Sequence, residues 1–327
     1  MEKTMTTYSE AIAAAIDIEM EKDPSIIVMG EDIGPQGGVF GTTRGLYDKY
    51  GCGRIIDTPI SENSFVGAAV GAAMTGLRPI AEIMYIDFIT LAADQIINQA
   101  AKVRYMYGGK VKVPMVIRTQ GGAGKGNAGH HSQSFEVLFC HIPGLKVVMP
   151  STPSDAAGLL MSSIADDNAV IFIEHKLLYN TEGTVSYETI PLGKADIKRT
   201  GDHITIVAVS HMVIKALEAA GKLKGQGISC EVIDPMTLSP LDTATIAGSV
   251  KKTGNLLIVH ESVKAAGTGA YIAAEVENEV FDYLDAPIGI LGAKFCPIPY
   301  AHPLESEVIP QTEDIIENVK TILGRNR

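Results

Sequence analysis

Two acidic residues in the run Asp57-Thr58-Pro59-Ile60-Ser61-Glu62 lie at a predicted junction between secondary-structure elements. A buried strand is predicted over 54–56, and a Gly/Ala-rich helix from Asn63 to Met74, with Ser61 as its N-cap. Open α/β sheets bind ligands at the carboxyl ends of their strands. Apolar neighbours disfavour the charged form of a carboxyl group, and here they are Pro59, Ile60, Phe65 and Val66. We therefore predict a carboxyl group that shares a proton with a ligand nitrogen. The alternative is an acidic residue that only stabilises the helix N-terminus, by ~0.3–1 kcal/mol.

A second candidate site is a glycine-rich loop that contains two adjacent histidines. Gly124–Gly129 matches G-x-G-x-x-G and follows a predicted strand. A dinucleotide fingerprint would also need a helix that opens within the motif and an acid about 20 residues further on. The loop leads instead to His130 and His131, which point apart and cannot form an i, i+4 metal pair. We predict a mobile, ligand-covering loop with one histidine as a general acid/base, or else as a solvated loop residue.

Three other motifs have both a functional and a structural interpretation. Asp166-Asp167-Asn168 either supplies oxygen ligands to a cation or forms a polar turn. Gly267-Thr268-Gly269 is predicted to start a helix, and an anion site there is the alternative. The helix face of Gly67–Ala73 allows another helix to approach closely, either within this chain or from a second chain.

The composition favours an enzyme of two domains. Of 327 residues, 46% are hydrophobic and 20% charged, which is typical of an α/β enzyme. A formal net charge of -11 without a basic stripe argues against nucleic acid as a partner. No apolar stretch is long enough for a membrane span, and the first residues lack a signal pattern, so we expect a cytoplasmic protein. Four widely spaced cysteines indicate buried thiols.

Short apolar strands alternate with helices in two blocks, which predicts an α/β protein with two doubly wound parallel-sheet domains. The predicted domains are 1–185 and 201–327, joined by a linker over 186–200. Thr7-x-x-Glu10 has the form of a capping box. The predicted strands are 26–29, 79–83, 113–117, 147–149, 170–173, 204–209, 230–233, 256–259 and 288–291. The longest predicted helix covers 88–105.

A series of ordered motifs resembles one family along essentially the whole chain. The motifs are Gly30-Glu31-Asp32, Asp57–Glu62, Gly76–Ile80, Tyr105–Gly109, His131-Ser132-Gln133-Ser134, Pro143–Val148 and Ile190–Ala195. The family is the beta subunit of the thiamine-diphosphate-dependent decarboxylating component of 2-oxo acid dehydrogenase complexes, the pyruvate and acetoin dehydrogenase group. The resemblance implies a pyrimidine-binding domain followed by a transketolase C-terminal-like domain.

The resemblance assigns roles to several residues. Glu62 is implied to hydrogen-bond the N1′ nitrogen of the aminopyrimidine and so to activate the cofactor, thiamine diphosphate, with Met84 and Phe88 packing on the pyrimidine. Met84 and Phe88 have the alternative role of core residues. His131 is implied to act as an acid/base when the acyl unit passes to lipoamide. A potassium site, built largely from backbone carbonyls, is implied at Met115, Ser163, Ile164, Asp166 and Asn168.

The family also implies partners. Its alpha chain holds magnesium and the diphosphate through a Gly-Asp-Gly motif, which this sequence lacks. We therefore expect a heterotetramer of two alpha and two beta chains that serves a lipoyl acyltransferase. The stretches 98–102 and 176–183 are more similar to acetoin dehydrogenase members, although pyruvate remains an alternative substrate. His130 replaces a Gln that often precedes the histidine in pyruvate-specific relatives.

Three other interpretations remain open. One is the beta subunit of a branched-chain 2-oxo acid dehydrogenase. Another is an NAD-dependent oxidoreductase built on the Gly124–Gly129 loop. The last is a non-enzymatic assembly subunit that contributes only a surface to a complex.

Overall fold

The computed structural model describes residues 4–324, which divide into two compact units. Unit 1 comprises the chain up to Gly121 together with Leu138–Leu192, and unit 2 comprises Gly122–Val137 and the chain from Gly193 onward. The glycine-rich loop 122–137 falls inside the predicted domain 1–185, yet its contacts place it in unit 2. The reason is its hydrogen bonding to residues 261–305, described below.

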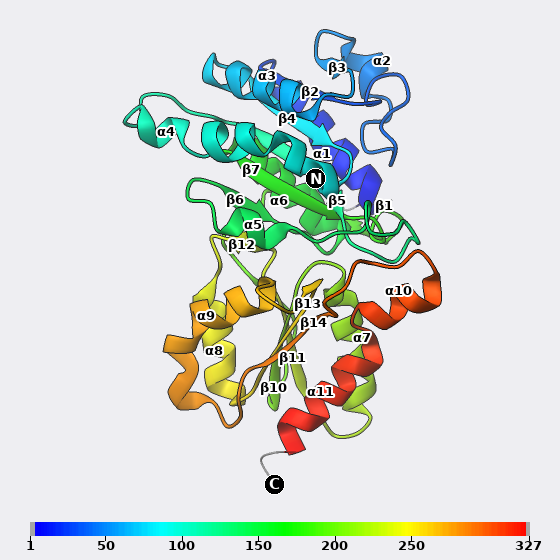
Figure 1. Cartoon of the computed structure of the whole chain (residues 1–327), viewed down its shortest axis with the longest axis vertical. Helices are drawn as coiled ribbons and strands as arrows, with labels where there is room; N and C mark the ends of the chain where they lie inside the picture. The colour runs from blue at the N-terminus through cyan, green and yellow to red at the C-terminus, as the bar shows by residue number, and fades with distance from the viewer. Residues whose placement is uncertain (1–3, 325–327) are drawn as a thin grey trace. The chain divides into compact units, whose positions relative to one another are not determined.

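Unit 1 is built on a parallel sheet, blue to green in Figure 1. Its strands lie in the order β6-β7-β5-β4-β2-β3 and all neighbouring pairs are parallel. Their bounds are β2 (Ile26–Gly30), β3 (Ile55–Asp57), β4 (Arg78–Ile83), β5 (Val116–Gly121), β6 (Lys146–Val148) and β7 (Val170–His175). A separate antiparallel pair joins β1 (Thr4–Thr7) to β8 (Glu182–Val185).

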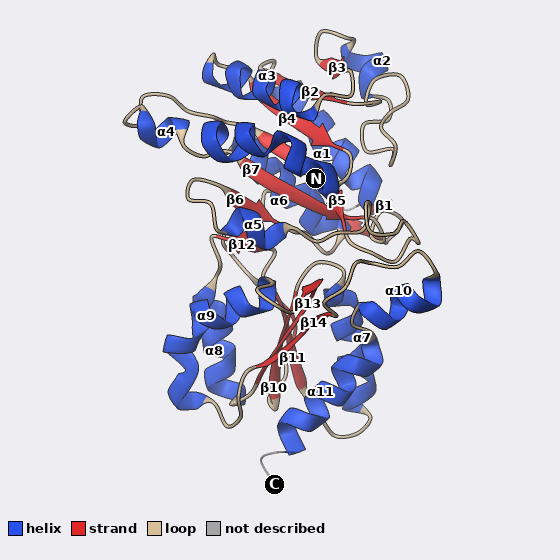
Figure 2. Cartoon of the chain, in the orientation of Figure 1, coloured by secondary structure: helices blue, strands red, loops and turns tan. Residues whose placement is uncertain are grey.

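Helices cover both faces of this sheet (Figure 2), as the doubly wound arrangement requires. Helix α1 packs against α6, and α3 packs against the helical turns that follow β4. The bounds are α1 (Tyr8–Lys22), α2 (Leu46–Tyr50), α3 (Glu62–Met74), α4 (Val103–Met106), α6 (Pro153–Ala165), a 3₁₀ helix Ile86–Ala92 and a π-helix Gln95–Ala100, with α5 (Glu136–Cys140) at the division between the units. The prediction of a single helix over 88–105 is therefore wrong, because the segment is divided into a 3₁₀ helix, a π-helix and α4.

Unit 2 contains a second, smaller sheet with helices on its faces. The order is β14-β13-β10-β11-β9, parallel except for β9 at the edge. Its strands are β9 (Asp196–Arg199), β10 (Ile204–Ala208), β11 (Cys230–Asp234), β13 (Leu256–Val263) and β14 (Gly289–Ala293), with the short β12 (Thr237–Ser239) nearby in sequence. Its helices are α7 (Met212–Lys224), α8 (Thr243–Thr253), α9 (Thr268–Val280), a 3₁₀ turn Phe281–Tyr283, α10 (His302–Val308) and α11 (Thr312–Gly324). The predicted α/β class with two doubly wound sheets is confirmed.

Local sequence signals explain several helix starts. Thr7 and Glu10 form the predicted capping box: the Thr7 hydroxyl accepts from the Glu10 amide at 3.3 Å, and the Glu10 carboxylate accepts from the Thr7 amide at 3.0 Å. Helix α9 begins at Thr268 directly after Gly267, as predicted. Ser61 stands at the N-cap of α3, but its hydroxyl donates to the Pro59 carbonyl at 3.2 Å instead of capping the helix.

A buried charge network lies on one face of the unit 1 sheet. Arg118 on β5 donates to Glu82 on β4 at 2.7 Å and to Glu174 on β7 at 2.7 and 2.9 Å, and all three side chains are buried. Tyr179 donates to Glu174 at 2.6 Å. Although burial lowers the pKa of Arg118, the charges of Glu174 and Glu82 together raise it. Removal of one member would leave an unpaired buried charge, so the network ties three neighbouring strands together.

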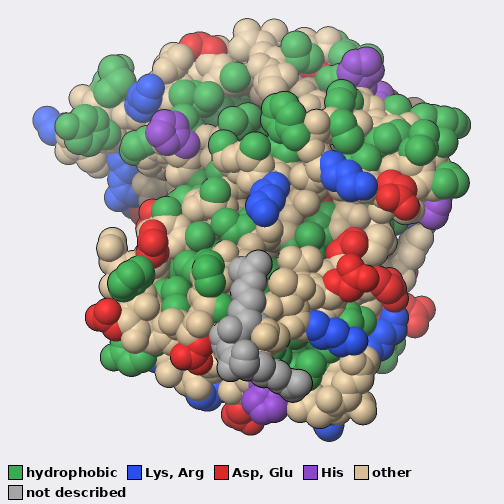
Figure 3. All heavy atoms as spheres, turned by 60° about the horizontal axis from the view of Figure 1, so that its bottom comes forward, with side chains coloured by type: hydrophobic (Ala, Val, Ile, Leu, Met, Phe, Trp, Pro, Cys, Tyr) green, Lys and Arg blue, Asp and Glu red, His purple; other side chains and the backbone are tan. Residues whose placement is uncertain are grey.

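Surface features agree in part with the composition. On the face in Figure 3, Lys and Arg side chains are scattered among Asp and Glu. All four cysteines are free, but the prediction of buried thiols is wrong for Cys52 and Cys296, which are exposed. Within residues 4–324, no helix has the length and apolar character needed to cross a membrane.

Candidate active site

Acidic side chains gather where β2 and β3 end in unit 1. Asp57 ends β3, and Glu31 directly follows β2. Glu62 is the first residue of α3 and is buried, with 7% of its surface exposed. Glu31, Asp57 and Glu62 therefore bring three carboxyl groups to this edge of the sheet.

Glu31 lies close enough to Glu62 for the two charges to interact. Burial and the charge of Glu62 raise the pKa of Glu31, although the Ser61 amide donates to its carboxylate. Glu31 Oε1 is buried and has no partner within the described residues.

The apolar neighbours predicted around Glu62 divide into two groups. Phe65 and Val66 are buried in unit 1, whereas Pro59 and Ile60 are exposed, with 83% of the Ile60 surface accessible.

Met84 and Phe88 lie in the segment that follows β4, both half-buried. Between them, Tyr85 has a positive φ of 24°, an unfavourable conformation for a side chain of this size. Its ring packs edge-on against Phe40 at 5.6 Å and Phe88 at 6.4 Å between centroids. The strained segment therefore builds an aromatic cluster at the same strand edge as Glu31. The sequence prediction missed Phe40 and Tyr85.

His131 lies in unit 2, on the loop 122–137, and is half-buried, whereas His130 is exposed. The loop contains no helix before Glu136, so the helix required by a dinucleotide fingerprint is missing. The amides of Gly124 and Gly126 donate to the carboxylate of Glu305 on α10, at 2.7 and 3.1 Å. The motif thus binds an internal carboxylate.

The far end of this loop is joined to a buried hydrogen-bond chain in unit 2. Glu136 accepts from the Thr268 hydroxyl at 2.7 Å, Thr268 contacts the Ser262 hydroxyl at 3.1 Å, and Ser262 contacts His260 Nδ1 at 2.8 Å. Burial raises the pKa of Glu136. This series of hydrogen bonds joins side chains from three separate segments of the sequence, so no local motif predicts it.

We expect His260 to make the stability of the protein sensitive to acid. Burial lowers the pKa of His260 to about 4, from its ordinary 6.5. Between these values the unfolded chain binds a proton that the folded chain excludes, so stability falls as the pH falls. The loss between about pH 7 and pH 5 is roughly 2 kcal/mol. Urea denaturation at both pH values should show a smaller loss in the His260→Gln variant. The control is His203→Gln, which removes an exposed imidazole; equal pH dependence in wild type and H260Q would contradict the prediction.

The residues of the predicted potassium site lie together in unit 1. Met115 precedes β5, and the others end or follow α6. Arg78 donates to the carbonyl oxygens of Ile164 at 2.9 Å and Asp166 at 3.1 Å. The Asp166 carboxylate accepts from Asn168 and Lys146. These hydrogen bonds make 166–168 an ordered turn. The carbonyl oxygens of Ile164 and Asp166 already accept from the cationic side chain of Arg78.

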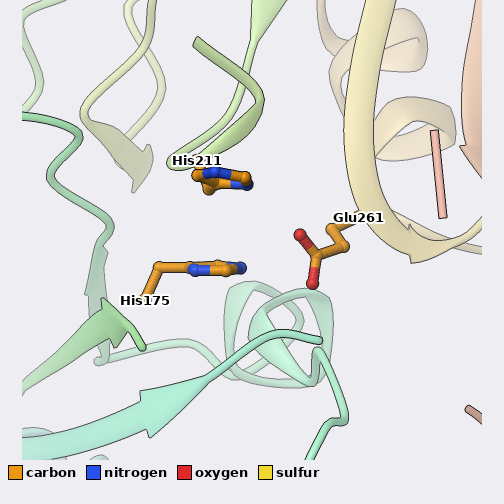
Figure 4. Close-up of side chains that lie close together, drawn as sticks. All are labelled: His175, His211 and Glu261. Carbon is orange, nitrogen blue, oxygen red and sulfur yellow. The ribbon is translucent and has the colours of Figure 1, made fainter. Parts of the chain in front are cut away.

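Figure 4 draws three further polar side chains, one from unit 1 and two from unit 2. His175 ends β7 in unit 1 and accepts from the Leu177 amide at 3.2 Å through Nδ1. In unit 2, His211 precedes α7, and Glu261 of β13 accepts from the Ala123 amide. None of these three residues lies in a recognisable sequence motif, so the sequence did not predict a role for them.

Comparisons with known proteins define the class first. The chain matches "Transketolase, pyrimidine binding domain" over residues 4–182 and "Transketolase, C-terminal domain" over residues 193–315. A solved structure described as a split gene transketolase, an inactive beta4 tetramer, is similar with a TM-score of 0.80 over 98% of this chain and 99% of that chain. At 22% identity this likeness concerns the fold alone. The fold is therefore that of a two-domain transketolase-type protein.

Closer relatives narrow the class to a family. The acetoin:2,6-dichlorophenolindophenol oxidoreductase subunit beta of Bacillus subtilis is 47% identical, with 97% of each chain covered. The pyruvate dehydrogenase E1 component subunit beta of Rickettsia conorii is also 47% identical, over 97% of this chain and 98% of the relative. The acetoin subunit of Cupriavidus necator is 48% identical, over 93% of this chain and 94% of the relative. The chain belongs to the family of beta subunits of thiamine-diphosphate-dependent pyruvate and acetoin dehydrogenases.

Proposed function

We propose that this chain is the beta subunit of an enzyme that cleaves acetoin or decarboxylates pyruvate and passes the acetyl unit to the lipoyl group of an acyltransferase. One observation carries the proposal: the buried Glu62 lies beside Glu31, whose buried Oε1 has no hydrogen-bond partner among residues 4–324, inside a domain of the pyrimidine-binding type. Relatives at 47% identity carry the names of both activities.

The residues at the carboxyl edge of the unit 1 sheet fit an aminopyrimidine. Its ring nitrogens need hydrogen-bonding groups, and its faces need apolar contact. Glu62 would supply the carboxyl group, while Met84 and Phe88 would supply apolar surface. The unpartnered Glu31 Oε1 shows that this edge has polar capacity that unit 1 itself leaves unused.

Thiamine diphosphate, when bound, supplies a carbon nucleophile and an electron sink for carbonyl substrates. The residues of this chain do the rest. Glu62 would hold a proton at N1′ of the pyrimidine. His131 would move a proton at the transferred acyl group and the lipoyl sulfur.

A partner chain is part of the proposal. The relatives are named as beta subunits, and this sequence has no Gly-Asp-Gly motif for the diphosphate and magnesium. An alpha chain would supply both, in a heterotetramer of two alpha and two beta chains. Ser64, Ala68 and Gly71 form an exposed face of small side chains on α3, and Ile60 is exposed beside it. These features support a second chain at this surface.

Potassium binding at Met115, Ser163, Ile164, Asp166 and Asn168 remains a prediction, as does the cytoplasmic location. Carbonyl oxygens are suitable ligands for a monovalent cation. Since Arg78 already donates to two of them, potassium would bind through their remaining lone pairs.

The test is co-purification of this chain with the alpha chain encoded in the same organism, followed by a substrate panel of acetoin, pyruvate and branched 2-oxo acids. We expect the pair, with thiamine diphosphate and magnesium, to reduce an artificial electron acceptor with acetoin or pyruvate, and each chain alone to be inactive. Preference for branched 2-oxo acids would favour the branched-chain alternative. Tight NAD binding by the isolated chain would contradict the proposal.

A further inference from the structure

The carboxylate of Glu305 accepts hydrogen bonds from backbone amides. Glu305 lies on α10 and is buried, with 1% of its surface exposed. Oε1 accepts from the Gly124 amide at 2.7 Å, and Oε2 accepts from the Gly126 amide at 3.1 Å. Within residues 4–324, no Lys, Arg or His forms an ion pair with it. A buried carboxylate without a cation depends on these amides for its stability.

The glycine turn is shaped to receive this carboxylate. Gly124 and Gly126 have positive φ values of 96° and 67°, which direct successive amides toward one point. A Cβ atom at position 126 would lie 3.3 Å from the Tyr300 carbonyl, so the turn also lies close to the segment before α10. Ala123 packs in a small apolar cluster with Ala293, Val308 and Ile309. Polar and apolar contacts thus join the turn to α10.

The opposite end of the loop has its own carboxylate anchor. Glu136, five positions after His131, accepts from Thr268 at the start of α9. His131 therefore lies between two anchored ends. The segment between them is rich in glycine, and glycine loses more conformational freedom on ordering than any other residue. Without its first anchor, the segment would populate many conformations.

We propose that Glu305 is a positioning residue for His131, acting through the backbone of residues 123–126. The inference rests on the proposed role of His131 in acyl transfer. Glu305 touches neither substrate nor cofactor in this assignment; it limits the positions that the loop adopts. The G-x-G-x-x-G motif is thus an internal carboxylate site whose function is to orient the histidine that follows it.

The test compares Glu305→Ala and Glu305→Gln in the assembled enzyme with the control Glu307→Ala. Glu307 lies on the same helix with 76% of its side chain exposed, and forms an ion pair with Lys294 at 3.5 Å. Amide hydrogen exchange of residues 122–137 should rise by roughly tenfold or more in E305A. Acyl transfer to a lipoyl domain should fall by roughly 10- to 100-fold, while reduction of an artificial acceptor stays within about threefold. E305Q, which keeps one acceptor oxygen, should be intermediate, and E307A unchanged.

Different outcomes separate this inference from the proposed function. Unchanged amide exchange in E305A, or equal losses in acyl transfer and dye reduction, would overturn the positioning role. A wild-type enzyme that transfers no acyl group would instead overturn the proposed function, and with it the role given to His131, even if the exchange of the loop responded to E305A. If E305A does not fold, E305Q decides: normal exchange and normal transfer in E305Q would contradict the inference.

Discussion

Replacing Glu62 by Ala should abolish exchange of the thiamine C2 proton in the assembled enzyme and lower turnover by roughly 10²–10⁴-fold. Glu62 is the buried acid that begins α3, next to Glu31 at the carboxyl edge of the unit 1 sheet. Without it, the aminopyrimidine loses the group that shares a proton at N1′. Exchange measured by proton NMR after acid quenching reports this step directly.

Two further variants and one control test whether the acidity and the length of the Glu62 side chain matter. Glu62→Gln keeps the shape but not the acidity, so it should be nearly as inactive as Glu62→Ala. Glu62→Asp keeps the acid on a shorter side chain and should retain more exchange. Asp48→Ala removes an exposed carboxylate of unit 1 and should behave as wild type. Robust exchange of the C2 proton in E62A would contradict the role proposed for Glu62.

Replacing His131 by Ala should block transfer of the acyl group to a lipoyl domain, by roughly 10²–10⁴-fold, while reduction of an artificial acceptor persists. The reason is that a positioned acid/base is needed when the acyl unit moves to sulfur, whereas an artificial acceptor takes electrons without that proton transfer. Both reactions are measured on the same preparation, with a lipoyl domain in one assay and dichlorophenolindophenol in the other.

His130→Ala is the matched control, because this neighbouring histidine is exposed and lies outside the His-Ser-Gln match. It should change acyl transfer little. If H131A and E62A both left the reconstituted activity intact, the chain would be an assembly subunit rather than a catalytic one. If H131A lowered both reactions equally, His131 would act before the acyl transfer step.

Features that depend on neighbouring residues could be predicted from the sequence. Thr7 and Glu10 form their capping box because both partners lie within one helical turn. The alternation of apolar strands and helices predicted two parallel sheets, since the period of hydrophobic residues reflects which face is buried. The prediction of a single helix over 88–105 was wrong, because 3₁₀ and π-helical segments interrupt it. A Cβ atom on Gly67 of α3 would lie 3.0 Å from the Gln95 side chain, so α3 packs closely on this segment.

The sequence alone determined the two-sheet architecture and pointed to Glu62 and His131 through motifs that are local in the chain. Only the tertiary structure decided what surrounds them: Glu31 supplies the acceptor at the start of α3, and Glu305 holds the glycine turn near His131. The physical reason is sequence separation. A hydrogen bond between positions 124 and 305 leaves no periodic or local signal, because it forms only after folding has brought the two segments together.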